Sequence, residues 1–102
     1  MNGEMRLTAP EKVHYEKLVD FTVFPNPAAD EAYIDLKKYE GRVVNILLSD
    51  VAGHIVHNRI IEKAPSAPLR LDLTPFENGT YFIAIKSNNK RDVVRKLQIL
   101  KY

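Results

Sequence analysis

The stretch from Leu69 to Lys86 constrains the fold most strongly, because it holds two strand patterns on either side of a strong break. Its first part places Leu71 and Leu73 on the same face as its opening leucine, with polar residues between them, which is the period of a half-buried strand. The break follows because Pro75 lacks a backbone donor and Gly79 can adopt a positive φ. A second alternating run begins directly after it, so this part of the chain predicts two strands of a sheet.

Tyr81 stands at the head of that second run, with Ile83 and Ile85 on the same face. A Gly-x-Tyr sequence in this position suits a tyrosine corner, in which the phenol hydroxyl bonds to upstream backbone in a β-sandwich. A large core ring without that bond explains the same pattern, and we take it as the simpler interpretation. Both alternatives bury Tyr81.

Other segments of the chain show the same kind of pattern. Pro25-Asn26-Pro27 stops a short apolar run and fixes a rigid, extended kink. Residues 42–49 carry apolar side chains on both faces, so we expect a central strand there, followed by a hairpin turn from Asp50 to Gly53. We expect strands near residues 21–24, 32–36, 42–49, 54–61, 69–73, 80–86 and 92–100.

Seven short strands with turn signals and no helical periodicity predict an all-β fold, an antiparallel β-sandwich with Greek-key connections. The 102 residues suit one domain, and 45% hydrophobic and 27% charged residues are typical of a soluble globule. We assign residues 1–20 to a linker or leader with a possible edge strand, and residues 21–102 to the domain. The period-two spacing predicts a core of Val44, Ile46, Leu48, Leu71, Leu73, Tyr81, Ile83, Ile85, Leu97 and Ile99.

No group of residues in the sequence has the pattern of an active site. The chain has no cysteine, which excludes disulfides, thiolate metal ligands and a cysteine nucleophile. His54 and His57 lie three apart on an expected strand, so they point to opposite faces and cannot chelate a metal together. The acidic residues are dispersed, without a calcium loop, and no glycine-rich phosphate loop occurs. We therefore expect no enzyme activity, no metal and no cofactor.

A binding role is harder to exclude. Tyr33 and Tyr39 could present rings to a glycan, although packing against the sheet is the simpler role. Residues 90–102 carry five basic side chains against one acidic one, so this end has a charge of +4 and the rest of the chain −2. The total of +2 is too small to predict nucleic-acid binding, and no apolar run is long enough for a membrane span.

Four sequence boxes follow one another along the chain. They are Val23 to Asp30, with Pro25, Asn26 and Pro27; Ile46 to Val56, with Asp50 and Gly53; Leu71 to Ile83, with Gly79 and Tyr81; and Lys96 to Lys101. Together they extend over Phe21 to Tyr102, about 80% of the chain. This order resembles the type A C-terminal sorting domain of cargo proteins of the type IX secretion system of Bacteroidetes.

The resemblance implies an Ig-like sandwich of about seven strands that acts as an address and not as a catalyst. It implies as partners an N-terminal cargo domain, the outer-membrane translocon, and a sortase-like surface machinery that removes the domain while attaching cargo to anionic lipopolysaccharide. The implied location is the periplasm in transit, then the outer-membrane surface or the extracellular space, without direct insertion into the membrane. No export signal opens the sequence, so we expect a fragment of a longer exported protein. The alternative is an Ig-like adhesion or carbohydrate-binding accessory module of a secreted surface protein.

The closing strand at residues 92–100 is the expected recognition element. A terminal strand at a sheet edge offers unpaired backbone groups to a partner. Basic side chains on it could steer the strand to an acidic receptor, while lysines exposed to water contribute little to folding. The residues that we expect to carry sorting or partner recognition are Arg95, Lys96, Leu97, Ile99 and Lys101.

Overall fold

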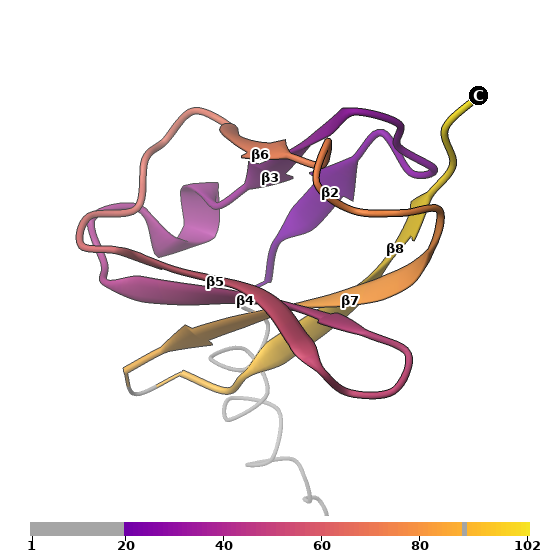
Figure 1. Ribbon diagram of the computed structural model, residues 1–102. Coiled ribbons are helices and arrows are strands. Elements are labelled where there is room, and N and C mark those ends of the chain that lie inside the picture. The colour runs from indigo at the N-terminus through magenta and orange to yellow at the C-terminus, as the bar shows by residue number, and fades with distance from the viewer. Residues whose placement is uncertain (1–19, 89) are drawn as a thin grey trace, which may run out of the picture.

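The computed structural model describes residues 20–88 and 90–102, and in it two antiparallel sheets pack face to face (Figure 1). The three-stranded sheet has the order β2-β3-β6, formed by Thr22–Phe24, Glu31–Asp35 and Leu69–Asp72. The four-stranded sheet has the order β5-β4-β7-β8, formed by Ile55–Ile61, Val44–Asp50, Gly79–Ser87 and Val93–Ile99. The predicted β-sandwich is confirmed, and β4 is a central strand as expected.

The chain changes sheet after β3, after β5 and after β6, which gives the sandwich its Greek-key character. The first of these crossings contains one turn of 3-10 helix, η1 (Lys37–Tyr39), whose Tyr39 is buried. The second crossing is fixed to the first, because Ala64 N–H donates to Arg42 O at 2.8 Å and Gly41 N–H donates to Ala64 O at 2.9 Å. These bonds hold the two connections together at one end of the sandwich.

The core lies between the two sheets, where the apolar faces of the strands meet. All ten predicted core residues are buried. Further buried side chains lie outside the observed strands, before β2 or in the connections, namely Phe21, Ala28, Leu36, Tyr39 and Ala64. The core therefore depends on the crossings as well as on the strands.

The strand bounds lie within two residues of the predicted ones. The predicted leader falls outside the described residues except for Asp20, which precedes β2. Within residues 20–88 and 90–102, no helix is long and apolar enough to cross a membrane.

Candidate functional site: the C-terminal segment and its contacts

The proline box, residues 25–28, lies along the outer edge of β8 although it is about 70 residues away in the chain. The amide of Asn26 bonds like a short piece of strand: its Nδ2 donates to Lys96 O at 2.8 Å, and its Oδ1 accepts from Gln98 N–H at 2.9 Å. Ala28 continues the pairing with its backbone, because its N–H donates to Gln98 O at 2.9 Å and its carbonyl accepts from Leu100 N–H at 2.8 Å. The prediction that this edge is open to a partner is therefore wrong between residues 96 and 100.

The prolines of the box explain why a side chain takes this role. Pro25 and Pro27 have no N–H group, so the backbone of the box can donate only from Asn26 and Ala28. The asparagine amide supplies both a donor and an acceptor at the same place. The C-terminal end of β8 consequently lies beside the loop that follows β2 (Figure 1).

We call residues 96–101 the C-terminal segment. Its last residue, Lys101, is bound to the connection between β6 and β7. Asn78 Oδ1 accepts from Lys101 N–H at 2.8 Å, and Asn78 Nδ2 donates to Lys101 O at 3.2 Å. The Lys101 ammonium donates to the carbonyls of Leu73 at 2.9 Å and Thr74 at 3.2 Å, and also to that of Phe76. The expectation that Lys101 is a solvated charge with little part in folding is therefore wrong.

The other predicted recognition residues differ in what they offer to a partner. Leu97 and Ile99 are fully buried, so a partner cannot contact them while the domain is folded. Arg95 forms an ion pair with Asp20, at the point where the chain enters the domain. Lys96 is exposed, and its side chain makes no ion pair or hydrogen bond with a described residue. Of the basic side chains predicted for recognition, Lys96 is the most available.

The tyrosine corner is present. Tyr81 OH donates to Glu77 O at 2.7 Å, and the ring is buried. The simpler interpretation, a core ring without this bond, was therefore incomplete. Gly79 has φ +155°, a positive value as predicted, but a Cβ there would lie 3.8 Å from the Tyr81 ring, so the position is not crowded. The third sequence box thus fixes the corner that precedes β7.

Asp50 and Gly53 form the predicted turn between β4 and β5. Asp50 Oδ1 accepts from the backbone N–H of Ala52 at 3.0 Å and of His54 at 2.9 Å, while Gly53 has φ +90°. The His54 N–H is the main cause that lowers the pKa of the Asp50 carboxyl. These contacts are local, so the second sequence box has a structural role in this turn.

The two tyrosines considered for glycan binding have different environments. Tyr39 is buried, and burial raises the pKa of its hydroxyl, which has no hydrogen-bond partner among the described residues. Packing is therefore its confirmed role. The ring of Tyr33 stacks on Phe24 with centroids 5.9 Å apart, and its hydroxyl donates to Glu31 at 3.1 Å.

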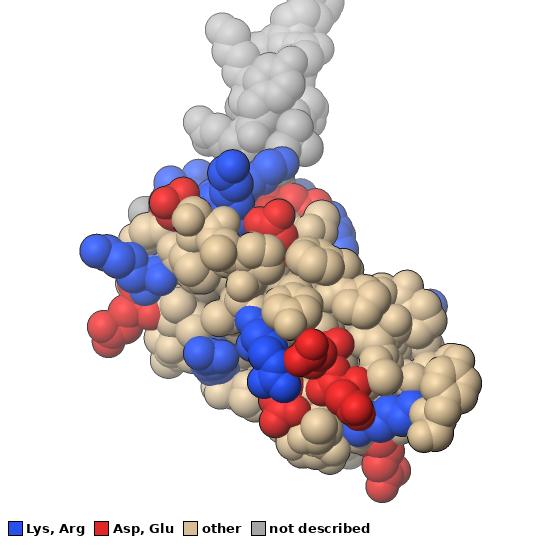
Figure 2. Space-filling view, turned by 90° about the horizontal axis from the view of Figure 1, so that it is seen from above, with Lys and Arg blue, Asp and Glu red and all other residues tan. Residues whose placement is uncertain are grey.

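Charged residues do not form one strong patch on the three-stranded sheet. Glu31 and Arg70 pair across β3 and β6 at 2.6 Å, and this bond is the main cause that lowers the pKa of Glu31. Figure 2 shows acidic and basic side chains interspersed on this face. The described residues include no group of three or more His, Cys, Asp and Glu side chains that could hold a metal ion.

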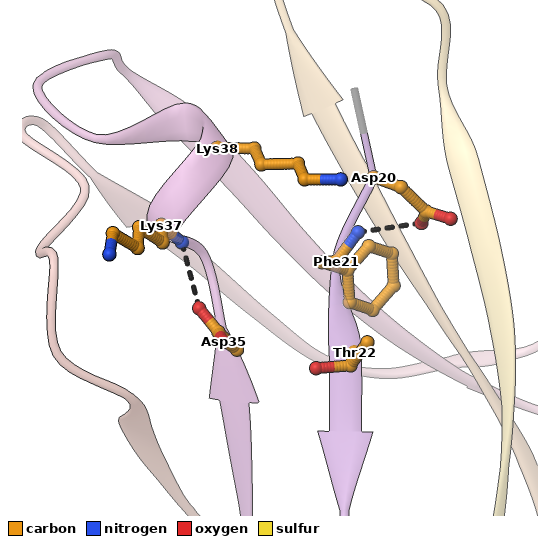
Figure 3. Close-up of a pocket in the computed structure, with 6 residues that line it drawn as sticks. All are labelled: Asp20, Phe21, Thr22, Asp35, Lys37 and Lys38. Carbon is orange, nitrogen blue, oxygen red and sulfur yellow. Dashed lines mark hydrogen bonds between the residues drawn. The ribbon is translucent and has the colours of Figure 1, made fainter. Parts of the chain in front are cut away.

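One pocket, of about 220 Å³, lies where the chain enters the domain beside η1 (Figure 3). In Figure 3 the Lys38 side chain points toward Asp20, while Asp35 Oδ1 accepts from the backbone N–H of Lys37 at 3.0 Å. The pocket lining combines the carboxylates of Asp20 and Asp35 with the side chains of Lys37 and Lys38, so neither charge sign is in excess. We assign no chemistry to this pocket.

A three-stranded and a four-stranded sheet around a tyrosine corner define an Ig-like β-sandwich. Two solved structures are similar to this chain. A DUF3244 family protein from Bacteroides vulgatus ATCC 8482, described with an immunoglobulin-like β-sandwich fold, matches with a TM-score of 0.63 and 19% identity, over 76% of this chain and 82% of that one. Dimeric latent PorU from Porphyromonas gingivalis matches with a TM-score of 0.54 and 20% identity, over 81% of this chain and 9% of that one. At these identities the likeness shows the fold alone.

The sequence itself shows the family. Residues 22–100 match the family of secretion system C-terminal sorting domains, and the chain belongs to this family. It is thus a sorting domain of type IX secretion, as the four boxes indicated, and the protein that carries such a domain is secreted to the cell surface or beyond it. No match was found among curated proteins.

Proposed function

We propose that this domain directs the protein that carries it through the type IX machinery to the cell surface, and that the machinery recognises the C-terminal segment in its bound form. The observation that supports this proposal is the meeting of the sequence boxes. The proline box and Asn78 both bond to the C-terminal segment, so three of the four boxes adjoin one another in space. A partner that binds this region could contact residues of several boxes at once.

The five predicted residues take different parts in this proposal. Lys96, exposed on the segment, is the side chain that an acidic receptor would contact. Leu97 and Ile99 act from the core, and Lys101 acts through the carbonyls that it binds, so these three keep the segment in place. Arg95 connects the segment to Asp20 and thus to the cargo side of the domain.

The proposed partners follow from the family. An outer-membrane translocon would receive the domain, a sortase-like surface machinery would process it, and the cargo would precede it in the chain. The proposed route runs from the periplasm to the outer-membrane surface or the extracellular space. The domain acts as a folded signal, without catalysis.

A reporter fusion tests the proposal directly. Residues 21–102, fused to a reporter with an export signal, should bring the reporter to the surface of a host that has the type IX pathway. Removal of Leu97 to Tyr102 should leave it in the periplasm. Surface display of the truncated reporter at the full-length level would refute the sorting role of this segment.

A matched pair of charge reversals separates recognition from stability. Lys96 and Lys63 are both exposed, so Lys96→Glu and Lys63→Glu should each change the free energy of unfolding by less than about 0.5 kcal/mol. Lys96→Glu should reduce export, whereas Lys63→Glu should not. Equal export of both variants would show that the machinery does not recognise Lys96.

A glycan-binding module is the second candidate, favoured by one observation. Phe24 is 43% exposed and stacks on Tyr33, which gives an aromatic pair on the three-stranded sheet. Binding of the domain to a glycan array, weakened by Tyr33→Ala, would support this candidate. An array without any bound glycan would exclude it and leave the sorting role alone.

A further inference from the structure

Strand β5 is the second edge of the four-stranded sheet, on the opposite side from β8 (Figure 1). It is seven residues long, and no strand within residues 20–88 and 90–102 pairs with its outer side. The edge of β8 is partly occupied by the proline box, so the two edges of the same sheet differ. An edge strand of this length is a template for pairing with another chain.

The direction of the backbone groups on β5 follows from the ladder. In an antiparallel sheet, alternate residues bond to opposite neighbours. Gln98 uses both its N–H and its carbonyl on the outer side of β8. The register through β7 and β4 carries this alternation to β5, where His57 faces Leu48 as a bonded pair. The N–H and C=O groups of Asn58 and Ile60 consequently point outward, away from the domain.

The exposed side chains of β5 are largely apolar. Ile60 is 64% exposed and Val56 is 39% exposed, and both share the outer face of the sheet with Asn58. Natural edge strands usually carry lysines, prolines, β-bulges or inward-pointing charges that prevent pairing. On β5 these devices are a register shift at Val56, between the pairs Leu48–His57 and Ser49–Ile55, and Arg59, which lies opposite the core residue Ile46. Lysine and proline are absent from the strand.

The sequence of β5 is almost symmetric about Asn58. An antiparallel copy centred on this residue would place His57 opposite Arg59 and, across the register shift at Val56, would bring Ile55 and Val56 beside Ile60 and Ile61. Apolar residues would meet apolar residues, and no two permanent like charges would face each other. The net charge of +2 gives little general repulsion between copies.

We propose that two copies of this chain associate through β5, antiparallel and about a two-fold axis at Asn58, which joins their sheets into one. A second copy is the occupant that the symmetric sequence fits, because an unrelated peptide would have no reason to match this order. The pairing uses the edge opposite to the C-terminal segment, so it is independent of the sorting proposal. One strand pair buries less than a standard interface, and the dimer is weak, with a Kd on the order of 0.1 mM.

Sedimentation of the full chain from about 10 μM to 1 mM should show a reversible monomer–dimer equilibrium in this range. Asn58→Pro removes an outward N–H, a substitution that an edge position tolerates, and it should weaken the dimer at least about tenfold. Ile60→Lys should weaken it similarly, because it adds a charge to the edge. Val94→Lys is the matched control: Val94 is 51% exposed on β8, and its substitution should leave the dimer unchanged.

Cysteine cross-linking tests the register. The chain has no native cysteine, so Asn58→Cys is the only thiol of its variant. A bonded antiparallel pair places its Cα atoms about 5.5 Å apart, within the range of a disulfide. Mild oxidation should therefore cross-link Asn58→Cys much faster than Val94→Cys, even if Asn58→Pro fails to fold. A chain that stays monomeric at 1 mM, equal cross-linking of both cysteine variants, or an unweakened dimer of a folded Asn58→Pro protein would each refute the proposal.

Discussion

Asn26→Ala should destabilise the domain and loosen its C-terminal segment. The substitution removes two hydrogen bonds, from Nδ2 to Lys96 O at 2.8 Å and from Gln98 N–H to Oδ1 at 2.9 Å. Each neutral bond contributes about 0.5–1.5 kcal/mol net, so the free energy of unfolding should fall by about 1–3 kcal/mol. With a urea m-value of about 1–3 kcal/mol/M, the midpoint should fall by roughly 1 M.

Hydrogen exchange adds a local readout to the urea titration. In Asn26→Ala, the Gln98 amide loses its acceptor and should exchange faster, whereas the Leu100 amide keeps its bond to Ala28 O. Asn58→Ala is a suitable control at low concentration, because the Asn58 side chain is exposed and makes no hydrogen bond with a described residue. An Asn26→Ala protein with the wild-type midpoint and unchanged Gln98 exchange would refute the role assigned to this amide.

Three smaller changes test the turns. Tyr81→Phe should lower the free energy of unfolding by about 0.5–1.5 kcal/mol in urea, because the bond to Glu77 O is lost; no change would make the corner bond incidental. Gly79→Val should cost about 1–3 kcal/mol through its φ of +155°, unless a wild-type midpoint shows that the backbone adjusts. The pKa of the Asp50 carboxyl is lowered from the ordinary aspartate value of 3.8, so its ionised form stabilises the fold above that pH and this stabilisation is lost as the pH falls through the lowered pKa. The difference in the free energy of unfolding between wild type and Asp50→Asn, measured in urea, should therefore shrink below about pH 4. A difference that does not change with pH would contradict this prediction.

The sandwich and its core were predictable because alternation alone carries that information. On β4 and β7, buried side chains recur at every second position, as in Val44, Ile46 and Leu48. A shift by one residue would move the whole apolar set to the solvent face, so the pattern fixes which face is buried. Ala28, Tyr39 and Ala64 are equally buried, but they lie outside every predicted strand, where no period identifies them.

The contacts of the C-terminal segment were not predictable in the same way. Alternation identifies a strand and its faces, but it does not say which segment lies against its edge. The sequence places Asn26 in an extended kink between two prolines and Asn78 in the break before Gly79, but the amides of both bond to backbone, 70 and 23 residues away. A sequence signal for this arrangement exists only in hindsight: Asn26 lies between two prolines, so it is a position where backbone donors are few.

The Lys101 side chain was misjudged for a related reason. A lysine near a chain end is usually a solvated charge, and its sequence neighbours give no sign of the three carbonyls that it meets. The carbonyls belong to the connection that follows β6, in which Pro75 interrupts the strand pattern. Only the fold brings the two together.

This contact yields a prediction about which C-terminal substitutions act through stability. Lys101→Met keeps most of the aliphatic stem but removes the donors, so the carbonyls of Leu73, Thr74 and Phe76 lose their bonds. Because the site is only partly buried, we expect a loss of about 1–3 kcal/mol in the free energy of unfolding. Lys101→Arg should lower the free energy of unfolding less than Lys101→Met, because arginine keeps the positive charge and its donors. It should still lower it somewhat, because the planar guanidinium cannot direct its donors to three converging oxygens.

Lys101→Glu should be the most destabilising of the three, because it places a carboxylate against carbonyl oxygens. Urea titration should rank the proteins, from the highest to the lowest free energy of unfolding, as wild type, Lys101→Arg, Lys101→Met and Lys101→Glu. Lys96→Glu should lie near wild type. Export that follows this order at Lys101, while Lys96→Glu lowers export without lowering stability, would separate support of the segment from its recognition. A Lys101→Met protein as stable as wild type would instead show that the ammonium is solvated, and that Lys101 remains a candidate for direct contact with the receptor.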